Sequence, residues 1–79
     1  MIITLYGKAG CHLCDEAREV LEDLAGGIAF DLREVDIRGD PALFERYRER
    51  IPVVTLDGAE VAEGRIDADA LAAALRTRA

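Results

Sequence analysis

The sequence of 79 residues has few of the features that mark membrane, secreted or multidomain proteins. No stretch reaches the roughly 18 consecutive apolar residues that a membrane span requires. The first six residues also lack the basic segment, the longer apolar stretch and the cleavage site of a secretory signal. We therefore expect a cytoplasmic protein that does not bind a membrane. Because so short a chain holds one hydrophobic core, residues 1–79 are expected to form one domain whose chemistry lies near its surface.

The sequence is also poor in basic residues, with ten lysines and arginines against sixteen acidic residues. Its formal net charge of −6 is repelled by phosphate backbones, so nucleic acid is not an expected partner. Hydrophobic residues make up 51% of the chain, which is too many for an intrinsically disordered protein. These values predict a folded, acidic domain, and we expect it to be a monomer.

Cysteine is equally scarce, and the two that are present, Cys11 and Cys14, stand only three positions apart. A disulfide between them would close a very small loop, which stabilises a fold little, and a reducing cytoplasm would not maintain it. A zinc site needs about four ligands, and beyond Cys11, His12 and Cys14 the sequence offers no second cluster of cysteine and histidine. We therefore expect no bound metal. Two interpretations remain: a redox-active pair, which the spacing favours, or two small core residues.

The spacing of apolar residues predicts an alternation of strands and helices. Asp40 and Pro41 are residue types that begin helices, and Asp57 with Gly58 is typical of a two-residue hairpin turn. The predicted order is a strand over 1–6, a helix from residue 11 to the glycines at 26 and 27, a strand over 28–36, a helix from 41 that ends before 51, strands over 53–56 and 59–62, and a helix after Asp67. This order predicts an α/β fold in which helices pack on a mixed sheet.

The two cysteines lie where the first predicted strand gives way to the first predicted helix. The free amides and the positive dipole end of a helix N-terminus stabilise an anion, which favours the thiolate of Cys11 as a nucleophile. Lys8 would favour the thiolate as well, whereas the acidic residues of the first helical turn would oppose it. Cys14 is one turn further on, where it could attack a mixed disulfide formed on Cys11. We therefore predict that Cys11 attacks and Cys14 resolves, in a moderately reactive, mainly reducing pair.

Residues 6–14, with the sequence YGKAGCHLC, resemble the strand end, lysine and C-x-x-C motif of the glutaredoxin family within the thioredoxin fold. Ile51 and Pro52 are similar to that family's Val-Pro or Ile-Pro pair, whose peptide bond is cis and faces the cysteines. The resemblance covers nearly the whole chain. It implies a thioredoxin-like, glutaredoxin-type single domain with a four-stranded mixed sheet and three helices, in the order β-α-β-α-β-β-α.

The same resemblance implies a thiol-disulfide oxidoreductase that needs no bound cofactor and acts on disulfide-containing proteins or small disulfides. Cys11 and Cys14 are the candidate catalytic residues. The backbone amide and carbonyl of Ile51 could pair with an extended substrate segment, like an added strand. The candidate substrate-binding residues are Tyr6, Lys8, His12, Leu13, Ile51, Pro52, Gly64 and Arg65.

The sequence departs from the family pattern at two places. His12 and Leu13 stand where the family commonly has proline and tyrosine. Glu63 stands where glutathione-using members carry a glycine, and its carboxylate would repel a carboxylate of glutathione unless Arg65 offsets it. Glutathione and a thioredoxin-reductase-type donor are therefore both compatible as reductants. Two other functions stay open: the carriage of a [2Fe-2S] cluster shared between two subunits through Cys11, or a redox-silent interaction module.

Overall fold

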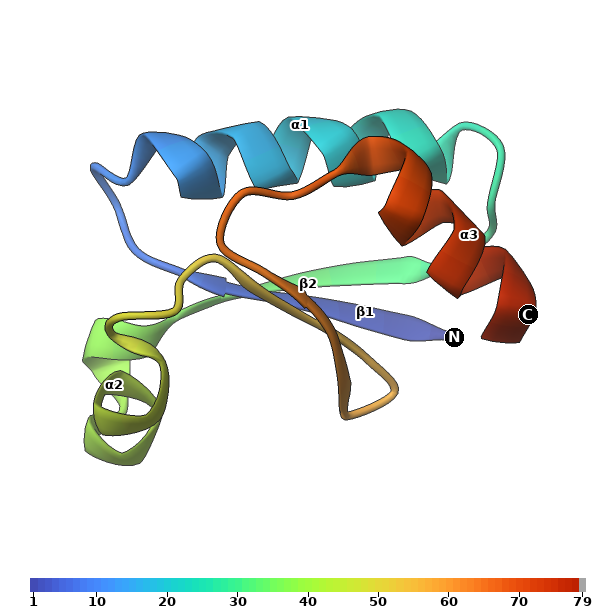
Figure 1. Ribbon diagram of the computed structural model, residues 1–79. Helices are drawn as coiled ribbons and strands as arrows, with labels where there is room; N and C mark the ends of the chain where they lie inside the picture. Colours follow the sequence, from blue (N-terminus) through green and yellow to red (C-terminus); the bar gives the residue numbers. More distant parts are fainter. Residues whose placement is uncertain (79) are drawn as a thin grey trace.

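The computed structural model describes residues 1–78, which form a four-stranded sheet with helices on both faces (Figure 1). The strands are β1 (Ile2–Gly7), β2 (Asp31–Asp36), β3 (Val53–Leu56) and β4 (Ala59–Glu63). The helices are α1 (His12–Ala25), α2 (Pro41–Tyr47) and α3 (Ala68–Arg78), and a short 3-10 helix, η1 (Ile37–Gly39), links β2 to α2. The predicted order of elements and the predicted fold class are confirmed.

The strands lie in the order β2-β1-β3-β4, which makes β1 a central strand. β1 is parallel to β2 and antiparallel to β3, and β3 is antiparallel to β4. The parallel pair is joined by the crossover through α1, whereas β3 and β4 are joined by a tight hairpin turn. The sheet is therefore mixed, as the sequence predicts.

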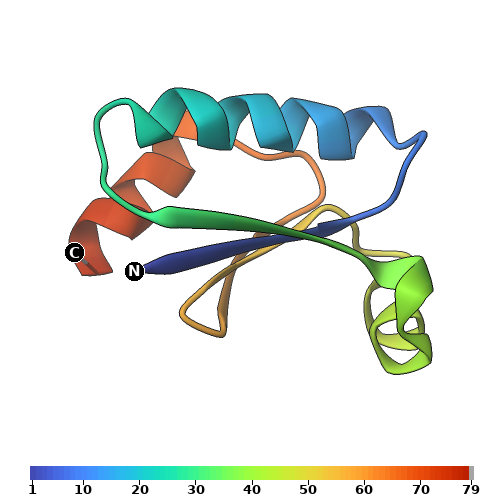
Figure 2. The ribbon, with the colours of Figure 1, turned by 180° about the vertical axis from the view of Figure 1, so that it is seen from behind.

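The two faces of the sheet carry separate cores because the helices divide between them. α1 and α3 cover one face, and α2 lies at the other (Figures 1 and 2). Apolar residues close together in the sequence can therefore belong to different cores. Leu32 of β2 packs on the larger core, whereas Ile37, just after β2, belongs to the smaller one. Within residues 1–78, none of the helices combines the length and the apolar character needed to cross a bilayer. The larger core contains Ile3, Leu5, Ala17, Leu21, Ile28, Val54, Leu56, Leu71 and Leu75, and the smaller core contains Ile37, Tyr47 and Val53.

The predicted start of the second strand differs from the structure because a hydrogen-bonded turn follows α1. β2 begins at Asp31 rather than at residue 28, since the amide of Ile28 still donates to the carbonyl of Leu24 at 2.9 Å in the turn that ends α1. α2 ends at Tyr47, before residue 51 as predicted, and the amide of Arg50 donates to the carbonyl of Tyr47 at 2.8 Å in the turn that follows. Apolar spacing alone does not separate such turns from the neighbouring elements.

The polar residues predicted to start a helix and to close the hairpin do so. The Asp40 carboxylate accepts hydrogen bonds from the amides of Ala42 at 2.9 Å and Leu43 at 3.3 Å, which caps α2. Asp57 and Gly58 have φ angles of 48° and 90°, and the type I′ hairpin turn requires a positive φ at both positions. These local signals therefore fix the start of α2 and the register of β3 against β4.

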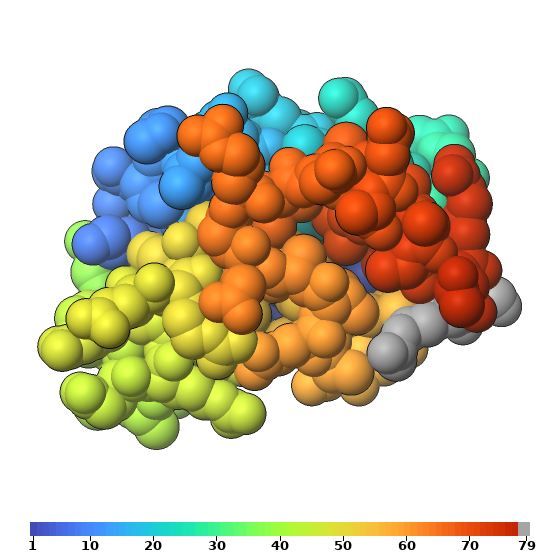
Figure 3. Space-filling model, in the orientation of Figure 1, coloured from blue at the N-terminus to red at the C-terminus, as the bar shows by residue number. Residues whose placement is uncertain are grey.

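The register of the sheet brings three connecting segments to one end of the molecule. Tyr6, near the end of β1, pairs with Val53 at the start of β3, and Val53 pairs with Glu63 at the end of β4. The residues that follow β1, precede β3 and follow β4 therefore leave the sheet at the same end. In Figure 3 the blue surface at the start of α1, the yellow surface before β3 and the orange surface after β4 meet on one face. Most of the predicted site residues belong to these three segments.

Candidate active site

Cys11 occupies the N-cap position of α1, with the extended backbone angles φ −97° and ψ 108° that a cap adopts. Its Sγ accepts a hydrogen bond from the backbone amide of Cys14 at 3.3 Å. The side chain is half-buried, so the sulfur can be reached from solvent. An amide donor and the positive end of the helix dipole both favour negative charge on this sulfur. The helix start therefore supplies the environment that the predicted nucleophile needs.

Cys14 has the opposite environment, because its side chain is only 1% exposed. Burial raises the pKa of its thiol to about 11, the hydrogen bond with Cys11 adds to this effect, and a hydrogen bond with the backbone of Lys8 works against it. At neutral pH Cys14 is therefore a protonated thiol that small molecules in solution reach poorly. This asymmetry supports the predicted division between an attacking Cys11 and a resolving Cys14.

Gly7, the last residue of β1, is a site residue that the sequence analysis missed. A Cβ atom at this position would lie 2.9 Å from the Sγ of Cys14 and 3.1 Å from its Cβ. The φ angle of Gly7 is not positive, so space against the thiol, and not backbone conformation, requires glycine here. Gly10, with φ 80°, is the residue that turns the loop before Cys11. The sequence does carry a signal for this role. Two glycines stand close together, at positions 7 and 10, although the turn needs only Gly10.

A cavity of about 320 Å³ borders Cys14 on the side of β2. Its walls include Gly7, Lys8 and Cys14 from the site, together with Arg18 of α1 and Glu34 of β2. Arg18 donates a hydrogen bond to the Glu34 carboxylate, which ties α1 to the neighbouring edge strand. Cys11 does not line this cavity, so the cavity lies beside the resolving thiol and not over the attacking one.

The structure brings some predicted substrate-binding residues to the cysteines and leaves one apart. Lys8 and His12 are exposed on either side of Cys11, and the half-buried Leu13 follows in the first turn of α1. Tyr6 points to the opposite face of the sheet from Gly7, because neighbouring residues of a strand alternate. Its ring stacks on that of Tyr47, with 4.9 Å between centroids. Tyr6 therefore packs against the α2 side of the sheet instead of lying beside the thiols.

The Ile51–Pro52 peptide bond is cis, as the resemblance implies. The Pro52 carbonyl accepts a hydrogen bond from the amide of Gly64 at 2.8 Å, which joins the segment before β3 to the segment after β4. The amide of Ile51 already donates to the Tyr47 carbonyl at 3.0 Å. The Ile51 amide is therefore not free to pair with a substrate segment, and of the two predicted backbone groups the Ile51 carbonyl remains available for one hydrogen bond.

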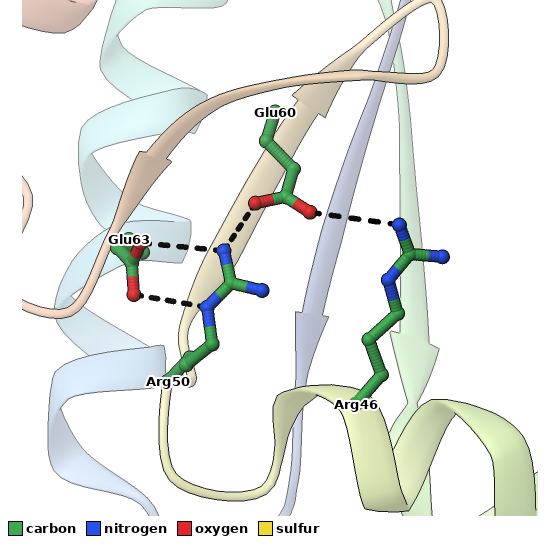
Figure 4. A network of polar contacts seen from close by, with 4 residues as sticks. All are labelled: Arg46, Arg50, Glu60 and Glu63. Atoms are coloured by element: carbon green, nitrogen blue, oxygen red, sulfur yellow. Dashed lines mark hydrogen bonds and ion pairs between the residues drawn. The ribbon is translucent and has the colours of Figure 1, made fainter.

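Glu63 is neutralised by a different residue from the one the sequence suggested. Its carboxylate accepts hydrogen bonds from Arg50, at 3.1 Å from Nε and 3.2 Å from Nη2 (Figure 4). Arg65, which the sequence offered as a possible compensating charge, is exposed and makes no ion pair among the described residues. The charge of Glu63 is therefore offset by Arg50, which stands thirteen positions earlier in the chain but lies next to the end of β4 in the fold.

Burial of Cys14 predicts a loss of stability of the reduced protein at alkaline pH. The thiol has a pKa near its ordinary value of 9.0 in the unfolded chain, whereas in the fold its pKa is raised to about 11. Between these values the unfolded chain has released a proton that the folded chain still holds, so the free energy of unfolding falls as pH rises from 9.0 to about 11. We expect a fall on the order of 2 kcal/mol in urea unfolding of the reduced protein. Cys14→Ala should remove this component, and an equal fall in both proteins would contradict the prediction.

The fold and the paired thiols together define a protein of the thioredoxin-fold class. A mutant thioredoxin from Halobacterium salinarum NRC-1 has the same fold, with a TM-score of 0.71 and 27% sequence identity. That match covers 96% of this chain and 72% of the thioredoxin chain.

Within this class, the family model described as Glutaredoxin-like domain (DUF836) matches residues 2–76, and the chain belongs to this family. The X-ray structure of protein XcR50 from X. campestris is 39% identical, with a TM-score of 0.77 over 95% of this chain and 96% of that chain. Protein Rv0508 from Mycobacterium tuberculosis (strain ATCC 25618 / H37Rv) is 33% identical over 70 residues, which are 82% of this chain and 72% of that protein. The predicted glutaredoxin-like resemblance is confirmed, and it places the chain in the general thiol-oxidoreductase-like class.

Proposed function

We propose that the protein is a thiol-disulfide oxidoreductase that reduces disulfides of proteins or small molecules by a dithiol mechanism. One observation carries this proposal: the Sγ of Cys11 caps α1 and accepts the amide of Cys14 at 3.3 Å, while the Cys14 thiol itself is buried. The pair thus combines a sulfur that a substrate can reach with a second thiol close behind it. A purely structural pair of core cysteines would have no need for this difference in exposure.

The reaction consists of two thiol-disulfide exchanges. The Cys11 thiolate attacks one sulfur of the substrate disulfide, a Cys11–substrate disulfide forms, and the other substrate sulfur leaves as a thiolate that takes up a proton. Cys14 then loses its proton and attacks the Sγ of Cys11, which releases the second substrate thiol and leaves a Cys11–Cys14 disulfide. The substrate has gained two electrons, and an external reductant must return both cysteines to thiols. No bound cofactor takes part in these steps.

Two classes of external reductant fit the proposal, glutathione and a thioredoxin-reductase-type enzyme. The neutralisation of Glu63 by Arg50 weakens the electrostatic objection to glutathione that the sequence raised. We propose that the protein works in the cytoplasm, because its thiols must be kept reduced between reactions.

The proposal is tested by counting thiols after the reduced protein is mixed with a small excess of bis(2-hydroxyethyl) disulfide. We expect both thiols to be lost together and to return on treatment with dithiothreitol. The donor is then identified by following NADPH oxidation with the same disulfide, once with glutathione and its reductase and once with thioredoxin reductase. If both thiols persist after oxidant treatment that oxidises free glutathione, the pair is redox-silent and the proposed function is wrong.

A further inference from the structure

Four charged side chains form a linear network that runs along β4 to the end of the sheet that carries the candidate active site (Figure 4). Arg50 lies between α2 and β3, and its guanidinium donates to Glu60 and, at 3.1 and 3.2 Å, to Glu63. Both glutamates belong to β4. Arg46 of α2 completes the network, with its Nη2 3.9 Å from an oxygen of Glu60. Two positive and two negative charges are thus paired with one another.

Arg50 is also attached to the segments that border the cysteines. Its backbone carbonyl accepts from the amide of Gly64 at 3.3 Å, and the same amide donates to the carbonyl of Pro52 at 2.8 Å. Its guanidinium carbon lies 5.4 Å from the centre of the buried Tyr47 ring, a distance at which a cation is attracted to the ring face. Backbone, ring and carboxylates together hold the Arg50 guanidinium over Glu63.

The network also determines which charges on the connecting segments are paired. The hydrogen bonds from Arg50 lower the pKa of Glu63, and the negative charge of Glu63 is matched by the positive charge of the guanidinium. Lys8, just before Cys11, and Arg65, just after Gly64, make no ion pair among the described residues. With Glu63 paired, these two residues are unpaired cations on the segments that follow β1 and β4.

We propose that Arg50 sets the charge preference of the site: by pairing with Glu63 it leaves Lys8 and Arg65 to favour disulfides that carry carboxylates. The inference rests on the proposed function, because it concerns the substrates of that reaction. Arg50 is a positioning and specificity residue, since it acts through Glu63 and does not touch the reacting sulfurs. Loss of Arg50 exposes one negative charge to the substrate, which penalises an anionic disulfide and leaves a neutral one unaffected.

The test compares two small disulfides of similar size, the dicarboxylate 3,3′-dithiodipropionate and the neutral bis(2-hydroxyethyl) disulfide. Each is mixed with pre-reduced protein, and the second-order rate constant for loss of the protein thiols is measured in a single turnover. For Arg50→Gln we expect the anionic-to-neutral ratio of rate constants to fall about two- to five-fold at low salt, and less at high salt. Glu63→Gln should raise the ratio, and the double variant Arg50→Gln with Glu63→Gln should return it toward that of the wild type.

Arg48→Gln is the matched control, because Arg48 is exposed at the end of α2, makes no ion pair among the described residues and has the same charge. Its ratio should match that of the wild type, and Arg50→Lys should retain most of the preference. If Arg50→Gln lowers both rate constants equally, or if Arg48→Gln shifts the ratio as much, this inference is overturned while the proposed function stands. If the wild type reduces neither disulfide, the proposed function is refuted and the inference falls with it.

Discussion

Replacement of Cys11 with serine is expected to reduce disulfide turnover to the uncatalysed rate. The serine hydroxyl stays protonated at neutral pH and does not exchange with disulfides, so the first bond to the substrate cannot form. The remaining Cys14 cannot take over, because its thiol is buried and its pKa is raised to about 11. The measurement is NADPH-coupled reduction of bis(2-hydroxyethyl) disulfide by the wild type and the Cys11→Ser variant.

Replacement of Cys14 with serine should have a different result, and the difference identifies the two roles. The first exchange on Cys11 still takes place, but no internal thiol releases the product, so a mixed disulfide accumulates and is seen as an added mass on the intact protein. Circular dichroism of both variants should match that of the wild type, since each change alters a single atom. Full turnover by Cys11→Ser would refute the assignment. A stable adduct on Cys14 in the Cys11→Ser variant, with none on Cys11 in the Cys14→Ser variant, would refute it as well.

Replacement of Gly7 with alanine is expected to be the most damaging single addition of a methyl group at this site. The added Cβ would lie 2.9 Å from the Sγ of Cys14, and both residues are buried, so β1 and α1 must move apart or the thiol must turn. Overpacking of this kind destabilises by about 1–3 kcal/mol. We expect a loss of this size in urea unfolding, together with slower release of the mixed disulfide by a displaced Cys14.

Two further variants separate the contact with sulfur from a general effect of replacing glycine. Gly27→Ala is the control, because a Cβ at Gly27 meets no atom within 4 Å and its φ is not in the left-handed region. In a Cys14→Ala background the Gly7→Ala change should destabilise less, since the 2.9 Å contact is gone and only the contact with the Cβ of residue 14, at 3.1 Å, remains. Equal losses in the two backgrounds would show that the Cys14 sulfur does not explain the need for glycine.

Local signals predicted most of the fold. The Asp40 cap, the Asp57–Gly58 turn and the apolar strands are read within a few residues, and they are sufficient to order the elements. The start of β2 was less predictable, because the turn after α1 continues the hydrogen bonding of the helix without a change in apolar spacing. The sequence also did not show which face of the sheet each apolar strand residue points to, because helices cover both faces.

Within the candidate site, the residues alone predicted the relation between neighbours in the chain, and the family resemblance implied the cis Ile51–Pro52 bond. The relation of Cys11 to Cys14 follows from three positions at a helix start. The contact of Gly7 with Cys14 depends on how closely α1 approaches β1, and the pairing of Arg50 with Glu63 depends on which segments meet at the end of the sheet. No spacing rule within a single element gives either contact. The sequence shows Arg65 close to Glu63 along the chain, whereas the fold places the guanidinium of Arg50 against the Glu63 carboxylate.

The position of β2 and β4 at the two edges of the sheet also bears on self-association. An exposed edge strand can pair with an edge of another molecule, which is a common route to aggregation, and charged side chains discourage it. β2 carries exposed acidic and basic side chains along its length, and β4 carries Glu60 and Glu63. In the proposed function, substrate proteins meet the thiols only briefly. The charged side chains discourage strand-like pairing along both edges, so the edges would not hold a partner after the exchange.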